Sequence, residues 1–190
     1  MLTEKVEFKG VLKILTTSSD QEDDWKVVFE DRNLIVNLAR KTLARALSGE
    51  GLVGIKYLRL GTGGHTPGQV FVAKVPGYDD YKTARTQLFS ETSSYDQTDP
   101  LPKFVMEKDL RSAATWYRVN PVGATEGAIE SITFIAALTK AEGNYTDNPS
   151  LAGFGYTEAA LCAENDTKDM FCMRCFPLVP KDPNRRIGLS

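Results

Sequence analysis

Cysteine and histidine are scarce in this sequence. It holds three cysteines, an odd number that argues against a fold built on paired disulfides, and it leaves open whether Cys162, Cys172 or Cys175 forms any bond. His65 is the single histidine, and no catalytic pattern surrounds it. A lone histidine in a glycine-rich turn is more often incidental than catalytic, so we expect no histidine chemistry here.

Long hydrophobic runs are absent as well. The longest, residues 132–138, is interrupted by Thr133 and is far shorter than the roughly 20 residues that a membrane helix needs. The first ten residues, MLTEKVEFKG, contain no apolar core of signal-peptide length. We therefore expect no membrane partner and no secretion signal, and we expect a chain made in the cytosol with free thiols.

An excess of charge of one sign is the third absence. The sequence has 23 Lys and Arg against 25 Asp and Glu, which gives a formal net charge of -2. This balance argues against a protein dominated by binding to nucleic acid or anionic membranes, although it leaves a local basic patch open. No specific nucleic-acid partner is expected.

Short strand-like segments make up most of what is present. Strict alternation of apolar and polar residues predicts a strand over 6–14, and 25–29 predicts a second strand antiparallel to it. Further predicted strands cover 55–60, 70–75, 103–107, 114–119, 129–138, 157–162 and 170–176, and the apolar centre of 129–138 predicts burial on both faces. One domain over residues 1–190 is expected, mainly β, as a β-sandwich or open barrel, with α+β as the alternative.

One helix is predicted near residues 33–48. Apolar residues recur there at steps of three and four, from Leu34 to Leu47, which places them on one helical face. Asp31 or Asn33 is the expected cap at its start, and Gly49 is the expected stop. The basic residues Arg40, Lys41 and Arg45 lie away from the apolar face, and a solvent-exposed face is favoured over nucleic-acid binding.

Two polar stretches are predicted to lack regular structure. Residues 76–102 form a long loop or excursion, ordered against partners, and residues 177–190, with three prolines, form an extended tail. The acidic pairs Asp23-Asp24 and Asp79-Asp80 lie in polar loops, where solvated carboxylates are the favoured interpretation. The pair Arg185-Arg186 is too short to carry an argument.

A cluster of glycines follows the strand predicted at 55–60, in the stretch YLRLGTGGHTPG. A phosphate-binding P-loop needs a Lys and then a Ser or Thr after its second glycine, and Gln69 and Val70 stand there instead. A dinucleotide loop needs a third glycine and a following helix, but Thr66 occupies that position and a β-like run follows. The predicted structure is a tight turn that needs positive φ, not a phosphate site.

The C-x-x-C motif at Cys172 and Cys175 is the other candidate for chemistry. It lies inside an apolar run, and residues three apart in a strand point to opposite faces, so the two thiols are expected to diverge. Neither a second C-x-x-C nor a nearby histidine completes a zinc site. We predict buried cysteines that act as small hydrophobes, with no metal, cofactor-binding or catalytic residue and no enzymatic activity.

Three segments together resemble a known family. Residues 33–40 (NLIVNLAR), continuing as a helix to Gly49, resemble an opening of the form N-L-I-V-N-x-G/A-R, helix, Gly. Residues 55–64 (IKYLRLGTGG) resemble an I-x-x-L-x-x-G-T-G strand and turn. Residues 156–161 (YTEAAL), 170–174 (MFCMR) and 176–181 (FPLVPK) resemble an ending x-T/I-x-E-A-G-L-F, L-F-A-R, F-x-x-I-x-K. In this order they are similar to small structural proteins of tailed bacteriophages, found among neck, collar, baseplate and tail-fibre components.

The chain departs from this pattern at several positions. Ala160 replaces the usual glycine, Cys162 a usual aromatic residue and Cys175 a usual polar one. The family pattern also leads us to expect one more full strand after Lys181, for which residues 184–189 are a poor substitute. An unfilled sheet edge would then be completed by a partner strand.

The resemblance implies a β-sandwich-like virion protein without catalysis. The expected role is assembly in multiple copies, as a homo-oligomer in a symmetric ring or collar at the neck, tail or baseplate, with fibre anchoring left open. Expected partners are other head–tail or tail proteins, and the expected location is the virion, with host cytoplasm before assembly. The alternative is a fibre or capsid-decoration module that contacts host glycans or the capsid, with Tyr78, Tyr81 and Tyr95 as candidate contacts.

Overall fold

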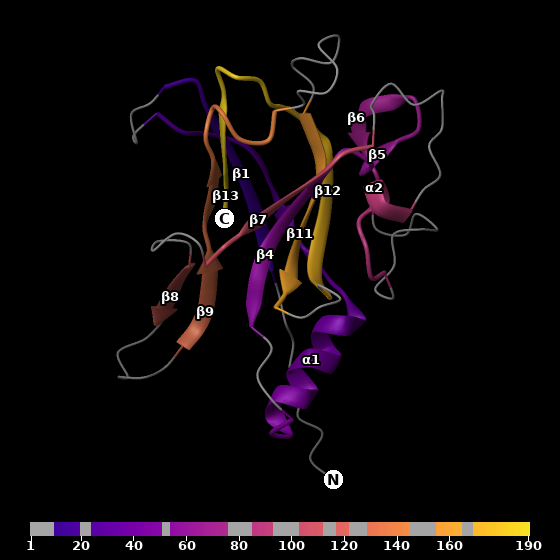
Figure 1. Ribbon diagram of the computed structural model, residues 1–190, viewed down its shortest axis with the longest axis vertical. Coiled ribbons are helices and arrows are strands. Elements are labelled where there is room, and N and C mark those ends of the chain that lie inside the picture. The colour runs from indigo at the N-terminus through magenta and orange to yellow at the C-terminus, as the bar shows by residue number, and fades with distance from the viewer. Residues whose placement is uncertain are drawn as a thin grey trace.

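The computed structural model describes residues 10–19, 24–50, 54–75, 85–92, 103–111, 117–121, 129–144, 155–164 and 169–190. Strands dominate these residues, which confirms the prediction of a mainly β fold with a helix (Figure 1). The helices are α1 (Asn37–Leu47) and α2 (Phe89–Thr92). The strands are β1 (Val11–Thr17), β2 (Lys26–Arg32), β3 (Leu34–Ile35), β4 (Ile55–Gly61), β5 (His65–Thr66), β6 (Gln69–Ala73), β7 (Val105–Asp109), β8 (Tyr117–Pro121), β9 (Ile129–Phe134), β10 (Ala136–Leu138), β11 (Gly155–Ala163), β12 (Met170–Pro180) and β13 (Arg186–Leu189).

Two antiparallel sheets enclose the main core. One has the strand order β10-β13-β1-β2 and the other β3-β12-β11-β4-β7, and the described strands do not close into a barrel. Their facing side chains form one cluster that joins Ile14 and Ile187 of the first sheet to Leu60, Tyr156 and Phe176 of the second. Burial of this apolar surface between the sheets is the main stabilising contribution of the fold.

A second cluster covers the outer face of the five-stranded sheet. Phe89 of α2 and Leu88 beside it pack against Met173 and Cys175 of β12, together with Val36. The β5–β6 hairpin adds Ala73 to this cluster. Strands β11 and β12 are therefore buried on both faces, as their nearly continuous apolar sequences require.

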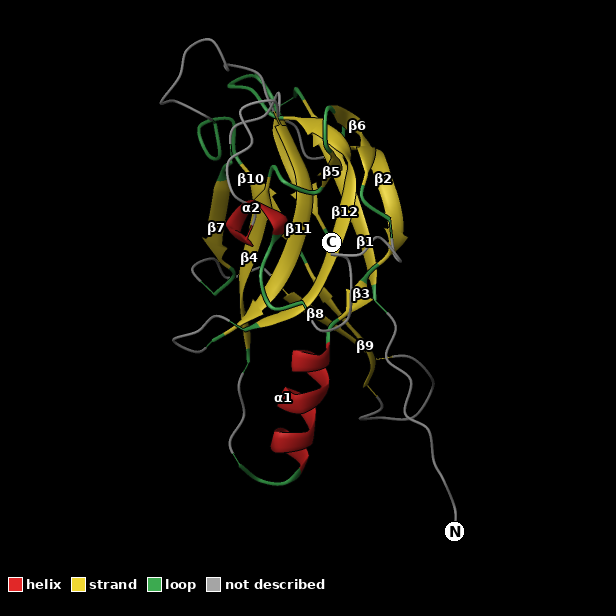
Figure 2. Ribbon diagram, turned by 90° about the vertical axis from the view of Figure 1, so that its right-hand side faces the viewer, coloured by secondary structure: helices red, strands yellow, loops and turns green. Residues whose placement is uncertain are grey.

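The helix begins later than its periodicity predicts. Leu34 and Ile35 form β3 and pair with Met173 and Cys172, so helical φ and ψ start only after Val36, which caps the helix without a side-chain hydrogen bond. The expected caps Asp31 and Asn33 are therefore wrong. The predicted stop is confirmed, because Gly49 has a φ of +80° directly after the last turn. Only Ala39 of the helix is buried, and α1 extends beyond the end of the two sheets (Figure 2).

The predicted extended tail is wrong. Pro177 and Pro180 lie in β12, and β13 lies in the interior of a sheet between β10 and β1. A turn at Asp182 reverses the chain, because its Oδ1 accepts a hydrogen bond from the Asn184 backbone N–H at 2.8 Å. β13 thus occupies the position for which a partner strand was expected.

The other predictions have mixed outcomes. β1 pairs antiparallel with β2, as predicted, and the two strands predicted at 157–162 and 170–176 are present as β11 and β12, which pair antiparallel with each other. The strand predicted at 129–138 divides into β9 and β10, and Ile132 is 56% exposed, so burial on both faces is wrong there. Most of the 76–102 excursion lies outside the described residues, as do Asp23, Asp79-Asp80, Tyr78, Tyr81 and Tyr95. Residues 88–90 of the excursion are buried: Leu88 and Phe89 belong to the second cluster, and Ser90 follows them in α2.

Candidate functional site

The glycine loop, residues 61–64 between β4 and β5, encloses a buried carboxylate. Glu158 of β11 is fully buried. Its Oε1 accepts hydrogen bonds from the Gly63 N–H at 3.2 Å, the Ser90 N–H at 2.8 Å and the Ser90 hydroxyl at 2.6 Å. Its Oε2 accepts one from the Phe89 N–H at 2.8 Å. We call these four residues the carboxylate cradle. Donors of the kind that bind an external anion are used here by a carboxylate of the same chain.

Neighbouring hydrogen bonds fix the loop further. The Ser90 hydroxyl accepts from the N–H of Thr62 at 2.8 Å, and Thr157 Oγ1 accepts from the N–H of Gly64 at 2.9 Å. His65 is 2% exposed, and its Nδ1 lies 2.7 Å from the Thr62 carbonyl oxygen. The loop is therefore a structural junction that joins β4, β11 and α2.

Close approach, not backbone strain, explains the glycines of this loop. Positive φ occurs among the described glycines at 49, 68 and 143, so the prediction of positive φ in the stretch 57–68 is confirmed at Gly68 and wrong at the glycines within 61–64. A Cβ on Gly61 would lie 2.5 Å from Glu158 Oε1, and a Cβ on Gly64 would lie 2.3 Å from the Thr157 carbonyl oxygen. Only glycine leaves room for the Glu158 carboxylate at position 61 and for the backbone of β11 at position 64.

Two cations lie against the ring of Phe89, one of the cradle residues. The Lys74 Nζ lies 3.7 Å from the centre of the Phe89 ring, and the guanidinium carbon of Arg85 lies 3.4 Å from it. Both cations and Glu158 also act electrostatically on Cys175, which places a buried negative charge and two positive charges in one region. Phe89, enclosed in this way, holds α2 against the sheet.

The three cysteines are buried, protonated thiols. Burial raises the pKa of Cys162 and of Cys172 from 9.0 to about 12, and burial also raises the pKa of Cys175. Cys175 packs in the second cluster, whereas Cys172 lines a cavity between the sheets, so the predicted divergence of the C-x-x-C thiols is confirmed. Among the described residues, no group of three or more His, Cys, Asp or Glu side chains is arranged to hold a metal ion.

A buried lysine forms a second polar junction that sequence reasoning missed. Lys181 is 2% exposed, and its Nζ donates to Asn144 Oδ1 at 2.7 Å and to the carbonyl oxygens of Lys140 and Asp182. The Tyr156 hydroxyl donates to the Gly143 carbonyl at 2.7 Å in the same turn. Burial lowers the pKa of Lys181, and burial raises the pKa of Tyr156. The sequence does hold a sign of this buried lysine, because Lys181 directly follows a segment of mainly apolar residues.

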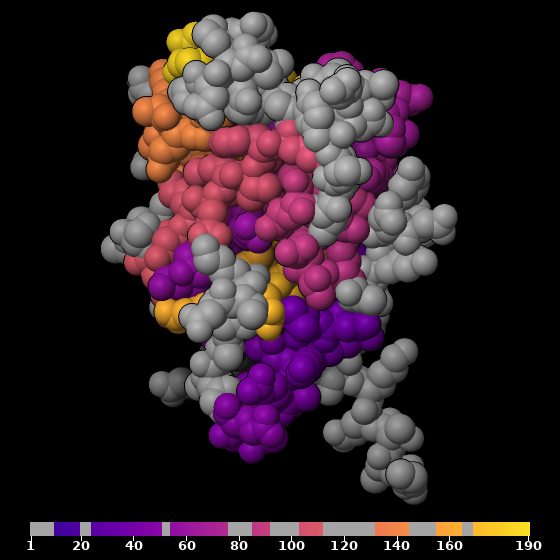
Figure 3. All heavy atoms as spheres, turned by 45° about the vertical axis from the view of Figure 1, so that its right-hand side comes forward, coloured from indigo at the N-terminus to yellow at the C-terminus, as the bar shows by residue number. Residues whose placement is uncertain are grey.

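Exposed apolar side chains mark the surfaces that are suited to contacts with another molecule. Leu47 at the end of α1 is 88% exposed, and α1 forms a projection at the lower end of the molecule (Figure 3). On the β5–β6 hairpin, Phe71 is 69% exposed, with Val72 and Val75 beside it also exposed. Arg40, Lys41 and Arg45 are exposed on α1, as predicted for a solvated basic face.

In the part of the chain that the structure describes, no helix is long and apolar enough to cross a membrane. Comparison with family models, with curated proteins and with solved structures finds no match to this chain.

Proposed function

We propose that the protein is a structural component of a tailed-phage virion, assembled in multiple copies at the neck or collar, or at the tail or baseplate. The observation that carries the proposal is the convergence of the three segments that resemble that family. They are far apart in the sequence, yet they supply β3, β12, β11 and β4, which are consecutive strands of one sheet. Figure 1 shows β4, β11 and β12 side by side.

The residues quoted for the resemblance also contact one another. Glu158 of the third segment accepts a hydrogen bond from Gly63 of the second, and Met173 of the third pairs with Leu34 of the first. Residues that contact one another in a fold tend to be kept together in proteins that share the fold. A fold shared with the resembled proteins would therefore account for the common order of the three segments. This supports the resemblance more than any of the degenerate segments does alone.

The exposed surfaces suit a role in assembly. Leu47 on α1 and Phe71 on the β5–β6 hairpin are large apolar side chains on different elements, both mostly in solvent. A ring of identical subunits needs two unlike surfaces on each copy, which meet head to tail. We assign one such surface to α1, around Leu47.

A charge placed at Leu47 tests this assignment. Leu47→Glu is expected to abolish the oligomer in light scattering and incorporation into particles, because an interface core does not accept an unpaired charge. The melting temperature of the monomer is expected to stay unchanged, since the side chain is exposed.

Lys41→Glu is the matched control on the same helix, at an exposed position about 120° around its axis. This variant is expected to assemble normally. Equal assembly of both variants would remove α1 from the proposed interface, and a wild-type chain that stays monomeric at all concentrations and is missing from particles would contradict the proposed function.

A further inference from the structure

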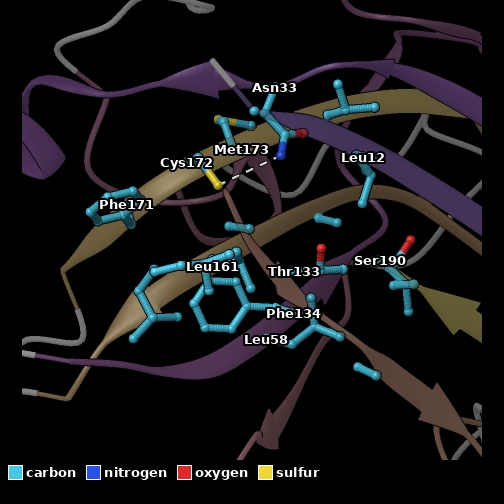
Figure 4. Close-up of a pocket in the computed structure, with 18 of the residues that line it drawn as sticks. Leu12, Asn33, Leu58, Thr133, Phe134, Leu161, Phe171, Cys172, Met173 and Ser190 are labelled. Carbon is cyan, nitrogen blue, oxygen red and sulfur yellow. Dashed lines mark hydrogen bonds between the residues drawn. The ribbon is translucent and has the colours of Figure 1, made fainter. Parts of the chain in front are cut away.

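A large apolar cavity lies between the two sheets. Figure 4 shows side chains from both sheets directed into it, among them Leu12 of β1, Leu58 of β4, Leu161 of β11 and Cys172 of β12. Phe134 of β9 also lines it, and α1 contributes Leu43. The cavity has a volume of about 600 Å³.

The cavity opens to solvent, because Val11 and Ile132 of its wall are 51% and 56% exposed, and its volume exceeds that of an ordinary packing defect. Protein interiors are close-packed, and voids larger than a water molecule are few. Pockets that bind small organic molecules have volumes of about 300–1,000 Å³ and mostly apolar walls with a few polar groups. The cavity meets both conditions, and an apolar cavity of this kind takes apolar molecules more readily than water.

The polar groups of the cavity wall limit which kinds of molecule can bind there. The Asn33 side-chain amide donates to the sulfur of Cys172 at 3.8 Å, and sulfur is a weak acceptor. Thr133 and Ser190 also line the cavity. No charged side chain occurs among the lining residues that the structure describes. An ion buried there would lose its hydration without a partner, so a neutral molecule is favoured.

We propose that this cavity binds a small, neutral, mainly apolar organic molecule that has one hydrogen-bonding group, which pairs with the Asn33 amide. A side chain inserted by a neighbouring protein is the competing occupant. The small molecule is favoured because the cavity is walled by both sheets and by α1, and does not lie on one flat face. The proposal is independent of a role in a virion.

The test is a titration of the intact chain with the neutral fluorescent probe N-phenyl-1-naphthylamine, followed by displacement with 1-decanol. Saturable binding of one probe per chain and displacement by 1-decanol are expected. Ala136→Leu adds three carbons inside the cavity and is expected to weaken probe binding at least tenfold, because the space is then occupied. Leu161→Trp is a second filling variant with the same expectation.

Ala137→Leu is the matched control, because adjacent residues of β10 point to opposite faces and Ala137 does not line the cavity. It is expected to bind the probe as the wild type does. Thermal unfolding of each variant confirms that it is folded. Failure of the folded wild type to bind, or equal binding by Ala136→Leu and Ala137→Leu, overturns the proposal. So does light scattering in which the wild type is oligomeric and both filling variants are monomeric, since a neighbouring chain then occupies the cavity.

Discussion

At the scale of single residues, Glu158 is the most informative position. A fully buried carboxylate is costly unless donors surround it, and here three backbone N–H groups and one hydroxyl do so. These donors come from the glycine loop and from α2, so one side chain joins segments about 70 and 95 residues away in sequence. The glycine loop does bind an anion, but that anion belongs to the chain itself.

Glu158→Gln is expected to destabilise the protein by about 2–4 kcal/mol, because the amide places N–H donors against N–H donors and leaves buried groups unsatisfied. Denaturant unfolding measures this loss. Glu164→Gln makes the same change directly after the same strand, where the carboxylate is exposed and pairs with Lys56 and Arg111, and it should cost at most about 1 kcal/mol. Equal effects of the two substitutions would refute the structural role of the cradle.

The buried thiols make stability depend on pH in the alkaline range. Each folded thiol has a raised pKa, so it holds its proton while an unfolded thiol ionises near its ordinary value of 9.0. The resulting stabilisation is fully present below about pH 9 and is lost as the pH rises towards about 12. At pH 10 the loss is expected to be about 1.4 kcal/mol for each thiol, relative to pH 8.

Unfolding curves at pH 8 and pH 10 measure this loss, and Cys162→Ala should reduce it by one thiol's share. In parallel, a disulfide exchange reagent at pH 8 should modify the native thiols slowly and all three thiols rapidly in denaturant. Rapid modification of the native protein would show that the thiols are accessible.

At the scale of elements, the sequence predicts those strands and helix ends that depend on neighbouring residues in the chain. Alternation identifies β1, and Gly49 ends α1 at the predicted position. β3 was missed because Leu34 and Ile35 fit the helical period, and only pairing with β12 places them in a strand. β13 was missed because four residues after a polar turn carry little signal, and its place between two strands is a tertiary property.

The cradle shows the same division between local and tertiary information. The sequence favours a structural loop at residues 61–64 over a phosphate site because the phosphate-binding groups are missing. Its physical cause, the close approach of Glu158, involves a residue nearly 100 positions away. A glutamate between Thr157 and Ala159 in an apolar run was a usable sign of a buried, bonded carboxylate.

Removal of β13 tests whether the C-terminal residues stabilise the fold as a strand between β10 and β1. Truncation after Arg185 is expected to abolish cooperative unfolding, because β10 loses its partner, β1 loses one of its two partners, and the core loses Ile187 and Leu189. Ile187→Asp, which puts a charge in the core, should act in the same direction, and Arg185→Ala in the preceding turn should stay folded. Circular dichroism during heating gives the answer. A truncated chain with an unchanged melting temperature would mean that β13 contributes nothing to the fold.

At the scale of the whole molecule, the described residues form two sheets with a core between them and a cover of α2 and the β5–β6 hairpin on one side. The two junctions around Glu158 and Lys181 place buried, hydrogen-bonded ionisable side chains inside the body. The large exposed apolar side chains include those on α1 and on the hairpin, at its periphery. Exposed apolar side chains at these positions suit the proposed assembly of copies.

Under the proposed function a tailed phage encodes this chain, and a cryo-electron microscopy map of that phage's particles is the most direct test of the proposal. We expect several copies of the two-sheet body in a symmetric ring at the neck, tail or baseplate, with α1 and its Leu47 buried between neighbouring copies. A complete map of the particle in which no density fits this fold, while the protein accumulates outside the particles, would contradict the central claim.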